Sequence, residues 1–207
     1  MNNNLKVALI TGGGTGIGRS SALALQKIGF KVIICGRREG PLKETALLAD
    51  PKNSKITVRI TDISEGRSVE ELFNKISVEF GRLDVMFNNA GMGAPRVPFD
   101  ILKENDWRRC VDVNLTGTFL CAQAAFKLMK EQKPQGGRII NNGSVSAHSP
   151  RPDTIAYTST KHAITGLTKS IALDGRAFNI ACSQLDIGNA DTAIGSRFKE
   201  GVPQASG

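Results

Sequence analysis

A glycine-rich turn, TGGGTGIG at residues 11–18, constrains the fold of this chain more than any other stretch. It follows an apolar run and precedes a helix-length segment, and its spacing fits G-x-x-x-G-x-G at Gly12, Gly16 and Gly18. Neither the usual G-x-G-x-x-G of dinucleotide folds nor the P-loop pattern is present. Glycines at the start of a helix let a pyrophosphate approach unpaired backbone N–H groups at the positive end of the helix. The turn therefore indicates a dinucleotide site, with a merely flexible turn as the alternative.

Apolar runs rich in valine and isoleucine alternate with helix-length segments along the chain. This alternation predicts parallel strands joined by helical crossovers. The expected strands are 5–10, 31–35, 55–60, 83–87, 138–142 and 180–185, and the expected helices are 16–28, 39–49, 65–80, 104–130 and 155–173. Ser64 is expected to cap the third helix and Gly29 to end the first. We therefore predict a single α/β domain over residues 1–207, in which a doubly wound parallel sheet of six strands lies between two layers of helices.

Composition narrows the classes of function. The net charge of +8 comes from dispersed basic residues, so a solvated surface explains it better than a nucleic-acid interface. Two histidines, and four cysteines without C-x-x-C spacing, predict no metal site and buried, reduced thiols. No apolar run approaches the roughly 20 residues of a membrane helix, and the first residues lack the order of a signal peptide. We therefore expect a cytoplasmic protein without a membrane or nucleic-acid partner.

The end of the second predicted strand bears on the choice of dinucleotide. An acidic residue is expected there if the ribose carries a free 2′-hydroxyl, but the chain has Gly36 followed by Arg37. A 2′-phosphate carries roughly −1.5 to −2 charges and is held by arginine. We therefore prefer NADP over NAD, with a simple surface position for the arginine as the alternative.

The single tyrosine of the chain, Tyr157, lies four residues before Lys161, so both project from one face of a helix. Lowering a phenol pKa by 2 to 3 units, to work near neutral pH, takes roughly 3 to 4 kcal/mol. A lysine ammonium about 4 Å away at a dielectric near 20 supplies roughly 4 kcal/mol. With the Ser144 hydroxyl polarising the same substrate oxygen, such a pair predicts acid/base catalysis beside a bound nicotinamide. Without a nucleotide site, an ordinary pair on a helix surface is the alternative.

Five motifs occur in a fixed order through nearly the whole chain. They are T-G-x-x-x-G-x-G at residues 11–18, N-N-A-G at 88–91, a helix asparagine at Asn114, a serine at Ser144 and Y-x-x-x-K at Tyr157 and Lys161. Together they resemble the short-chain dehydrogenase/reductase family, in its single-domain branch. The resemblance implies a Rossmann-like α/β/α fold and an NAD(P)-dependent oxidoreductase that interconverts a carbonyl and a secondary alcohol on a small molecule.

The resemblance also implies a role for individual residues. Tyr157 would be the acid/base, Lys161 would also bind the nicotinamide ribose, and Ser144 would orient the substrate. Asn114 would hold a water that links Lys161 to solvent, while Asn88 would either join the cofactor site or only stabilise the sheet. Asp62 would contact the adenine, and residues 89–91 would line the adenosine ribose. The implied cofactor-binding residues are Gly12, Thr15, Gly16, Ile17, Gly18, Arg37, Asp62, Ile63, Asn89, Ala90, Gly91, Tyr157, Lys161, Gly188 and Thr192.

The chain departs from the family pattern in two places. After the last predicted strand the family usually has Pro-Gly-x-x-x-Thr, whereas this chain has Ile187 in place of the proline but keeps Gly188 and Thr192. Backbone contact with the nicotinamide carboxamide does not require a proline ring, so we expect binding to survive. Family members also commonly continue with a further helix and a seventh strand. Their absence here would leave a sheet edge open and would remove part of the substrate pocket.

Two hypotheses follow from these features. The first is an NADP(H)-dependent oxidoreductase, and the second is a catalytically silent nucleotide-binding sensor or scaffold on the same fold. The resemblance further implies a homotetramer or homodimer assembled through two long helices. The apolar positions that would form the contact, or would equally be ordinary core, are Phe119, Ala122, Ala125, Phe126, Ile164, Leu167 and Ile171.

Overall fold

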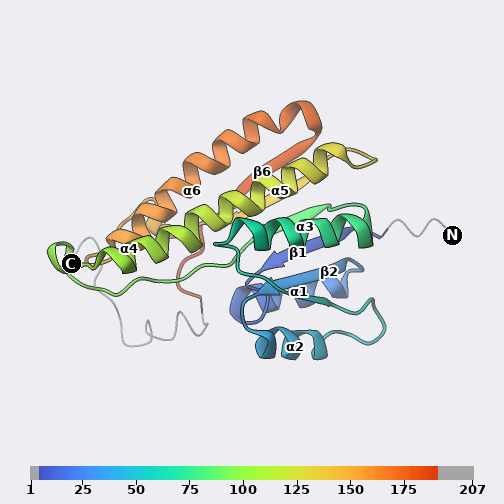
Figure 1. Cartoon of the computed structure of the whole chain (residues 1–207), viewed down its shortest axis with the longest axis horizontal. Helices are drawn as coiled ribbons and strands as arrows, with labels where there is room; N and C mark the ends of the chain where they lie inside the picture. The colour runs from blue at the N-terminus through green and yellow to red at the C-terminus, as the bar shows by residue number, and fades with distance from the viewer. Residues whose placement is uncertain (1–4, 191–207) are drawn as a thin grey trace.

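The computed structural model describes residues 5–190, which form a parallel sheet between two layers of helices (Figure 1). The strands are β1 (Val7–Thr11), β2 (Lys31–Gly36), β3 (Thr57–Ile60), β4 (Val85–Asn88), β5 (Gly137–Asn142) and β6 (Ile180–Leu185). The helices are α1 (Gly16–Lys27), α2 (Glu39–Leu47), α3 (Gly66–Phe80), α4 (Glu104–Val111), α5 (Gly117–Glu131) and α6 (Ile155–Asp174). The six strands follow the order β3-β2-β1-β4-β5-β6. The predicted doubly wound fold is thereby confirmed.

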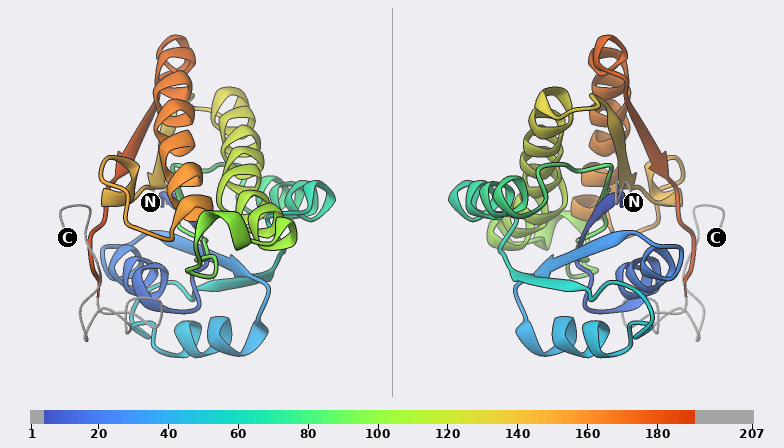
Figure 2. Two further views of the ribbon diagram at one scale, coloured as in Figure 1. Left: turned by 90° about the vertical axis from the view of Figure 1, so that its left-hand side faces the viewer. Right: turned by 90° about the vertical axis from the view of Figure 1, so that its right-hand side faces the viewer.

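The two faces of the sheet are covered by different helices (Figure 2). Leu9 of β1 packs in a core cluster with residues of α3 and α5, whereas its neighbour Ile10 packs in a second cluster with residues of α1 and α2. Both side chains are fully buried, and burying one such side chain stabilises the fold by about 1.5–3 kcal/mol. Because both faces are buried, the strands appear in the sequence as continuous apolar runs.

The strand order reverses between β1 and β4, which pair side by side in register, with Leu9 opposite Met86. The chain first moves outward from β1 to β2 and β3, and then returns to build β4, β5 and β6 on the other side. Open parallel sheets bind ligands in the crevice at the carboxyl ends of the strands, at this reversal. The loops that follow Thr11 and Asn88 meet there.

The long helix predicted over 104–130 is interrupted. A π-helical segment, Asp112–Thr116, separates α4 from α5, and Asn114 lies at its centre. π-Segments inside helices are rare and often mark functional sites. A second prediction was also wrong, because the N-cap of α3 is Glu65 and not Ser64. The hydroxyl of Ser64 instead donates to Asp62 Oδ1 at 2.6 Å. Gly29 does follow the end of α1 with φ +93°, as expected of a helix stop.

Most apolar positions considered for a subunit contact belong to the core. Ala122, Ala125 and Ile164 are buried, and Phe126 and Ile171 pack against a core cluster. Phe119 is the exception among these, with 43% of its surface exposed. The core alternative therefore accounts for most of this set.

Within residues 5–190 no helix has the length and apolar character needed to cross a membrane. The same part of the chain contains no group of three or more histidine, cysteine or acidic residues arranged to hold a metal ion. The cysteines have no disulfide partner, and three of them are buried: Cys35, Cys110 and Cys121.

Candidate active site

A cavity of about 560 Å³ opens at the carboxyl edge of the sheet. Most residues that the sequence predicted for the site line it together, although they come from seven separate stretches of chain. They are Gly12, Thr15, Gly16, Ile17, Gly18, Arg37, Asp62, Ile63, Asn89, Ala90, Gly91, Ser144, Tyr157, Lys161 and Gly188. Asn114 does not line the cavity, and Thr192 lies outside the described residues.

The glycine turn lines this cavity, and its glycines allow a close approach of the backbone. Gly12 has φ +65° and Gly16 has φ +51°, a conformation that glycine adopts without strain. A Cβ added at Gly18 would lie 2.3 Å from the carbonyl oxygen of Gly12. The first turn of α1 contains no acidic residue, and Thr15 makes no side-chain cap there. The bare N–H groups and helix dipole thus form a cradle that fits the pyrophosphate of a dinucleotide.

Thr11, at the end of β1, fixes the loop that follows β4. Its hydroxyl accepts hydrogen bonds from the backbone N–H groups of Asn89 and Ala90, both at 3.0 Å. The Asn89 side chain donates back to the Thr11 carbonyl at 2.9 Å. Asn88, by contrast, is buried and donates to Asn141 Oδ1 on β5 at 2.9 Å. The side chain of Asn88 thus joins β4 to β5, which agrees with the second of the two roles considered for it, stabilisation of the sheet.

Arg37 and Asp62 face each other across the far end of the cavity. The guanidinium of Arg37 lies 3.8 Å from the Asp62 carboxylate, and 54% of its side chain is exposed. Asp62 is held in turn by the backbone N–H of Ser64, which donates to its carboxylate at 3.0 Å. Such an exposed pair adds little stability, so Arg37 is available for recognition of a negative group.

Tyr157 and Lys161 lie on one face of α6, as the helical spacing predicted. Lys161 Nζ is 5.5 Å from the centroid of the Tyr157 ring and donates to the backbone carbonyl of Asn142 at 2.6 Å. The lysine is 6% exposed. Burial lowers the pKa of Lys161 to about 8, although the negative charge of Asp186 acts in the opposite direction.

The predicted effect of Lys161 on the phenol is not found in this structure. Burial raises the pKa of Tyr157 above its ordinary value, and the hydrogen bond with Ser144 and the charge of Arg151 only partly oppose this. The prediction from helical spacing considered the charge of Lys161 but not burial, which disfavours the charged phenolate. Tyr157 therefore holds its proton at neutral pH.

Ser144 begins the turn after β5, and its backbone is fixed by a residue that the sequence interpretation missed. Its hydroxyl accepts a hydrogen bond from Ser146 N at 3.1 Å, and its own N–H donates to Asp186 Oδ1 at 3.1 Å. Asp186 Oδ2 lies 2.8 Å from His148 Nε2. A contact between residues 42 positions apart leaves no local pattern in the sequence. The available signal was an acidic residue, Asp186, directly after the last predicted strand.

Asn114 is buried beside the site, and both polar atoms of its side chain make hydrogen bonds. Its Oδ1 accepts from Met92 N at 2.8 Å, and its Nδ2 donates to Met92 O at 2.9 Å. The same Nδ2 lies 3.3 Å from Thr160 Oγ1 on α6. Asn114 thus ties the loop after β4 to the π-segment and α6, and its predicted role in holding a water stays a prediction.

Comparison with known proteins agrees with this arrangement. A family model described as short chain dehydrogenase matches residues 6–202. The 3beta-hydroxysteroid dehydrogenase of Mediterraneibacter gnavus is 34% identical over 192 residues, which cover 93% of this chain and 68% of that relative.

Solved structures show the same fold. A 3-ketoacyl-(acyl-carrier-protein) reductase from Brucella melitensis, complexed with NADH, is 30% identical with a TM-score of 0.87, over 93% of this chain and 79% of that one. Actinorhodin polyketide ketoreductase with NADPH is 27% identical with a TM-score of 0.89, over 96% and 76% of the two chains. These neighbours thus include one bound to NADH and one bound to NADPH.

Proposed function

The chain belongs to the short-chain dehydrogenase family of oxidoreductases, and we propose that it is an NADP(H)-dependent enzyme that interconverts a carbonyl and a secondary alcohol. One observation carries this proposal. Tyr157, Lys161 and Ser144 line the same cavity as the glycine cradle of α1, so a proton donor and a dinucleotide site face one space. The silent sensor on the same fold has no observation in its favour and becomes an outcome of the test.

The cofactor site that we propose is built from backbone and a few side chains. The segment 12–18 would hold the pyrophosphate, Asp62 the adenine and residues 89–91 the adenosine ribose. Lys161 would bind the nicotinamide ribose, and the stretch that includes Gly188 and Thr192 the carboxamide. A nicotinamide cofactor, when bound, supplies or accepts the hydride.

NADP is the preferred cofactor in this proposal because of the residues after β2. Gly36 leaves no carboxylate to repel a 2′-phosphate, and the adjacent Arg37 lines the cavity. Both NADH and NADPH occur in the solved relatives, so the family alone does not decide. Arginine supplies planar, charged hydrogen bonds to phosphate oxygens.

Proton transfer in this proposal runs through Tyr157 Oη. The pKa of the partly buried phenol is raised, so it carries a proton at neutral pH and can donate it to a carbonyl oxygen as the hydride arrives. The Ser144 hydroxyl acts on the phenol, whose pKa it lowers in part, and it would orient the same substrate oxygen. In the reverse reaction, oxidation of an alcohol, the phenolate form of the same group would accept the proton. Asn114 would hold a water that returns a proton toward Lys161.

The test is a panel of ketones, aldehydes and secondary alcohols followed by NADPH absorbance with the full chain. We expect turnover of at least one carbonyl, and a loss of about 10²–10⁴-fold in the Tyr157→Phe variant. NADPH affinity of that variant should stay within about twofold, which separates lost chemistry from lost binding. Undiminished turnover in Tyr157→Phe contradicts the mechanism. NADPH binding without turnover of any substrate favours the silent sensor.

We also propose that the chain forms a homodimer or homotetramer in the cytoplasm. Phe119 is a large apolar side chain left partly exposed on α5. Light scattering at micromolar concentration tests this, and a monomer there contradicts it.

A further inference from the structure

Side chains link the carboxyl ends of β1, β4 and β5 beyond the point where the backbone ladder stops. The pairing of β4 with β5 reaches only as far as Asn88, opposite Asn141. One residue further along each strand, Asn142 Nδ2 donates to Asn89 Oδ1 at 3.1 Å. Asn89 Nδ2 in turn donates to the carbonyl oxygen of Thr11 at 2.9 Å. Two amide side chains therefore continue the connection across the three strand ends.

Asn142 also holds the buried ammonium of Lys161. Its backbone carbonyl oxygen accepts a hydrogen bond from Lys161 Nζ at 2.6 Å. Within residues 5–190 this is the one hydrogen bond of the ammonium, which makes no ion pair there. Because the lysine is 6% exposed, water has little access to replace that acceptor. The position of the Asn142 carbonyl therefore decides where the ammonium lies.

Other charged groups act on this ammonium from a greater distance. Burial lowers the pKa of Lys161, and Cys110 on α4 and Asp186 after β6 act in the opposite direction. The centroid of the Tyr157 ring lies 5.5 Å from Nζ. A hydrogen bond to the charged form of a group favours that form. The Asn142 carbonyl should therefore both fix the ammonium and help to keep it charged.

The neighbouring asparagine of β5 has no such connection to the site. Successive side chains of a strand point to opposite faces of the sheet. Asn141 is fully buried and donates to Thr168 Oγ1 on α6 at 2.9 Å. Asn142, by contrast, lines the cavity together with Asn89 and Lys161, whereas Asn141 does not. The two asparagines thus make amide bonds between the same strands, but only one of them touches the lysine.

We propose that Asn142 is a positioning residue for Lys161, because its side chain, tied through Asn89 to the end of β1, fixes the strand end whose carbonyl holds the ammonium. The importance of Lys161 in this inference rests on the proposed function. Gly12 follows Thr11 directly, so the same tie places the lysine relative to the glycine turn. A neutral hydrogen bond has a modest net value, and we expect effects of about 2- to 10-fold.

The first test needs neither cofactor nor substrate. Urea denaturation of the full chain from pH 6 to 10.5 gives the free energy of unfolding of each variant minus that of the same variant carrying Lys161→Met. For the wild type this difference should rise from about pH 8, because the pKa of Lys161 in the folded chain is about 8 and the unfolded chain binds more protons above it. In Asn142→Ala the rise should begin about 0.4 to 1 pH unit lower, since the ammonium has lost a fixed acceptor.

Asn89→Ala removes the other half of the same side-chain bond. It should lower the onset of the rise by the same amount as Asn142→Ala. The chain with both substitutions should shift no further than either one alone, because one bond cannot be lost twice. Shifts that add would show two independent effects and would overturn the inference.

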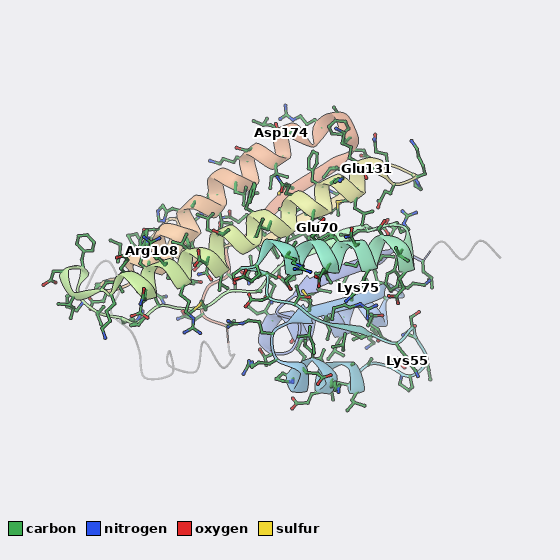
Figure 3. The ribbon with its side chains drawn as sticks, viewed as in Figure 1. Lys55, Glu70, Lys75, Arg108, Glu131 and Asp174 are labelled. Carbon is green, nitrogen blue, oxygen red and sulfur yellow. The ribbon has the colours of Figure 1, made fainter. Side chains whose placement is uncertain are left out.

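Two controls separate positioning from a general loss of structure. Asn141→Ala makes the same substitution one residue earlier in β5, and it should lower stability while leaving the onset in place. Asp174→Asn should also leave the onset in place, because Asp174 is the exposed last residue of α6 and is not among the residues that line the cavity (Figure 3). An unchanged onset in Asn142→Ala, or an equal shift in Asn141→Ala, overturns the inference.

Activity supplies the second measurement. With NADPH and a carbonyl that the chain reduces, kcat of Asn142→Ala should fall about 2- to 10-fold, and its alkaline limb should move to lower pH together with the onset of the stability rise. A shifted onset without any turnover supports the positioning of Lys161 and contradicts only the proposed enzyme. Turnover with an unchanged onset supports the enzyme and overturns this inference.

Discussion

The carboxylate of Asp186 accepts a hydrogen bond from the backbone N–H of Ser144, with Oδ1 3.1 Å from the nitrogen. Gln184 donates to the same oxygen at 2.6 Å, and His148 Nε2 lies 2.8 Å from Oδ2. The end of β6 thereby fixes the turn after β5. Burial alone would raise the pKa of Asp186, but the hydrogen bonds from His148, Gln184 and Ser144 lower it below its ordinary value. Asp186 is therefore charged near neutral pH.

Replacing Asp186 by alanine should reduce kcat for carbonyl reduction by about tenfold or more, because a displacement of about 1 Å in a catalytic group can cost up to about 100-fold. NADPH affinity should change less than kcat, since Asp186 is not among the residues that line the cavity. Steady-state kinetics and cofactor titration check the two quantities. Loss of cofactor affinity equal to the loss of kcat would show a general disruption instead.

Asp186→Asn separates geometry from charge. Its amide oxygen still accepts from Ser144 N, so kcat should stay closer to the wild-type value than in Asp186→Ala. The negative charge that raises the pKa of Lys161 is gone, however. The alkaline limb of the pH–rate profile should then shift to lower pH. An unchanged profile would rule out electrostatic coupling between Asp186 and Lys161.

Buried Lys161 predicts a pH-dependent stability. Its pKa in the folded chain is about 8, below the ordinary 10.5, so the unfolded chain binds more protons between these values. Stability should therefore rise with pH across that window, by about 3 kcal/mol in total. Below about pH 8 the unfavourable burial of the ammonium is fully present.

Urea denaturation without cofactor, from pH 7 to 10.5, measures this effect. The quantity to compare is the free energy of unfolding of wild type minus that of Lys161→Met, because the contributions of the other titrating groups cancel in this difference. That difference should increase in favour of wild type as the pH rises. Lys169→Met, which removes an exposed lysine of the same helix, should show the wild-type pH dependence. A flat difference for Lys161→Met would contradict the burial argument.

Local patterns in the sequence were enough to predict the scaffold of the site. Strands such as β1 are buried on both faces, so their apolar runs are continuous, and the turn between Gly12 and Gly18 has a spacing that few folds share. Helical periodicity alone places Tyr157 and Lys161 on one face. These features depend on neighbours within a few residues, and that is why they could be predicted.

Other features depend on contacts between distant segments. The π-segment around Asn114 accompanies a tie to Met92, 22 residues away. The bond between Asp186 and Ser144 joins two strand ends with no local signature. The direction of the Tyr157 pKa shift depends on how deeply the phenol is buried, a quantity that sequence spacing does not contain. Packing therefore decided each point at which the sequence prediction was incomplete or wrong.

Arg37 should decide the choice between NADPH and NADH. Arg37→Asp places a second carboxylate beside Asp62, so NADPH affinity should fall by about 10- to 100-fold, in line with the loss of a charged hydrogen bond. NADH affinity should change by less than about threefold. Fluorescence titration with both cofactors measures the ratio. Lys43→Gln, which changes an exposed lysine of α2 that pairs with Glu39, is the control, and equal weakening of both cofactors by Arg37→Asp would contradict the phosphate role.

Gly18→Ala should damage the cradle itself. The added Cβ would lie 2.3 Å from the Gly12 carbonyl oxygen and 2.5 Å from Asn89 Nδ2, so the backbone of the turn must move. Overpacking of this kind costs about 1–3 kcal/mol, and NADPH binding should weaken with it. Gly40→Ala in α2 is the matched control, because nothing lies within 4 Å of its Cβ, and its stability should be unchanged or up to about 1 kcal/mol higher. Denaturant unfolding and cofactor titration of both variants measure these effects. If Gly18→Ala has the stability and the NADPH affinity of the wild type, the turn has room for a side chain and is not a close-fitting cradle.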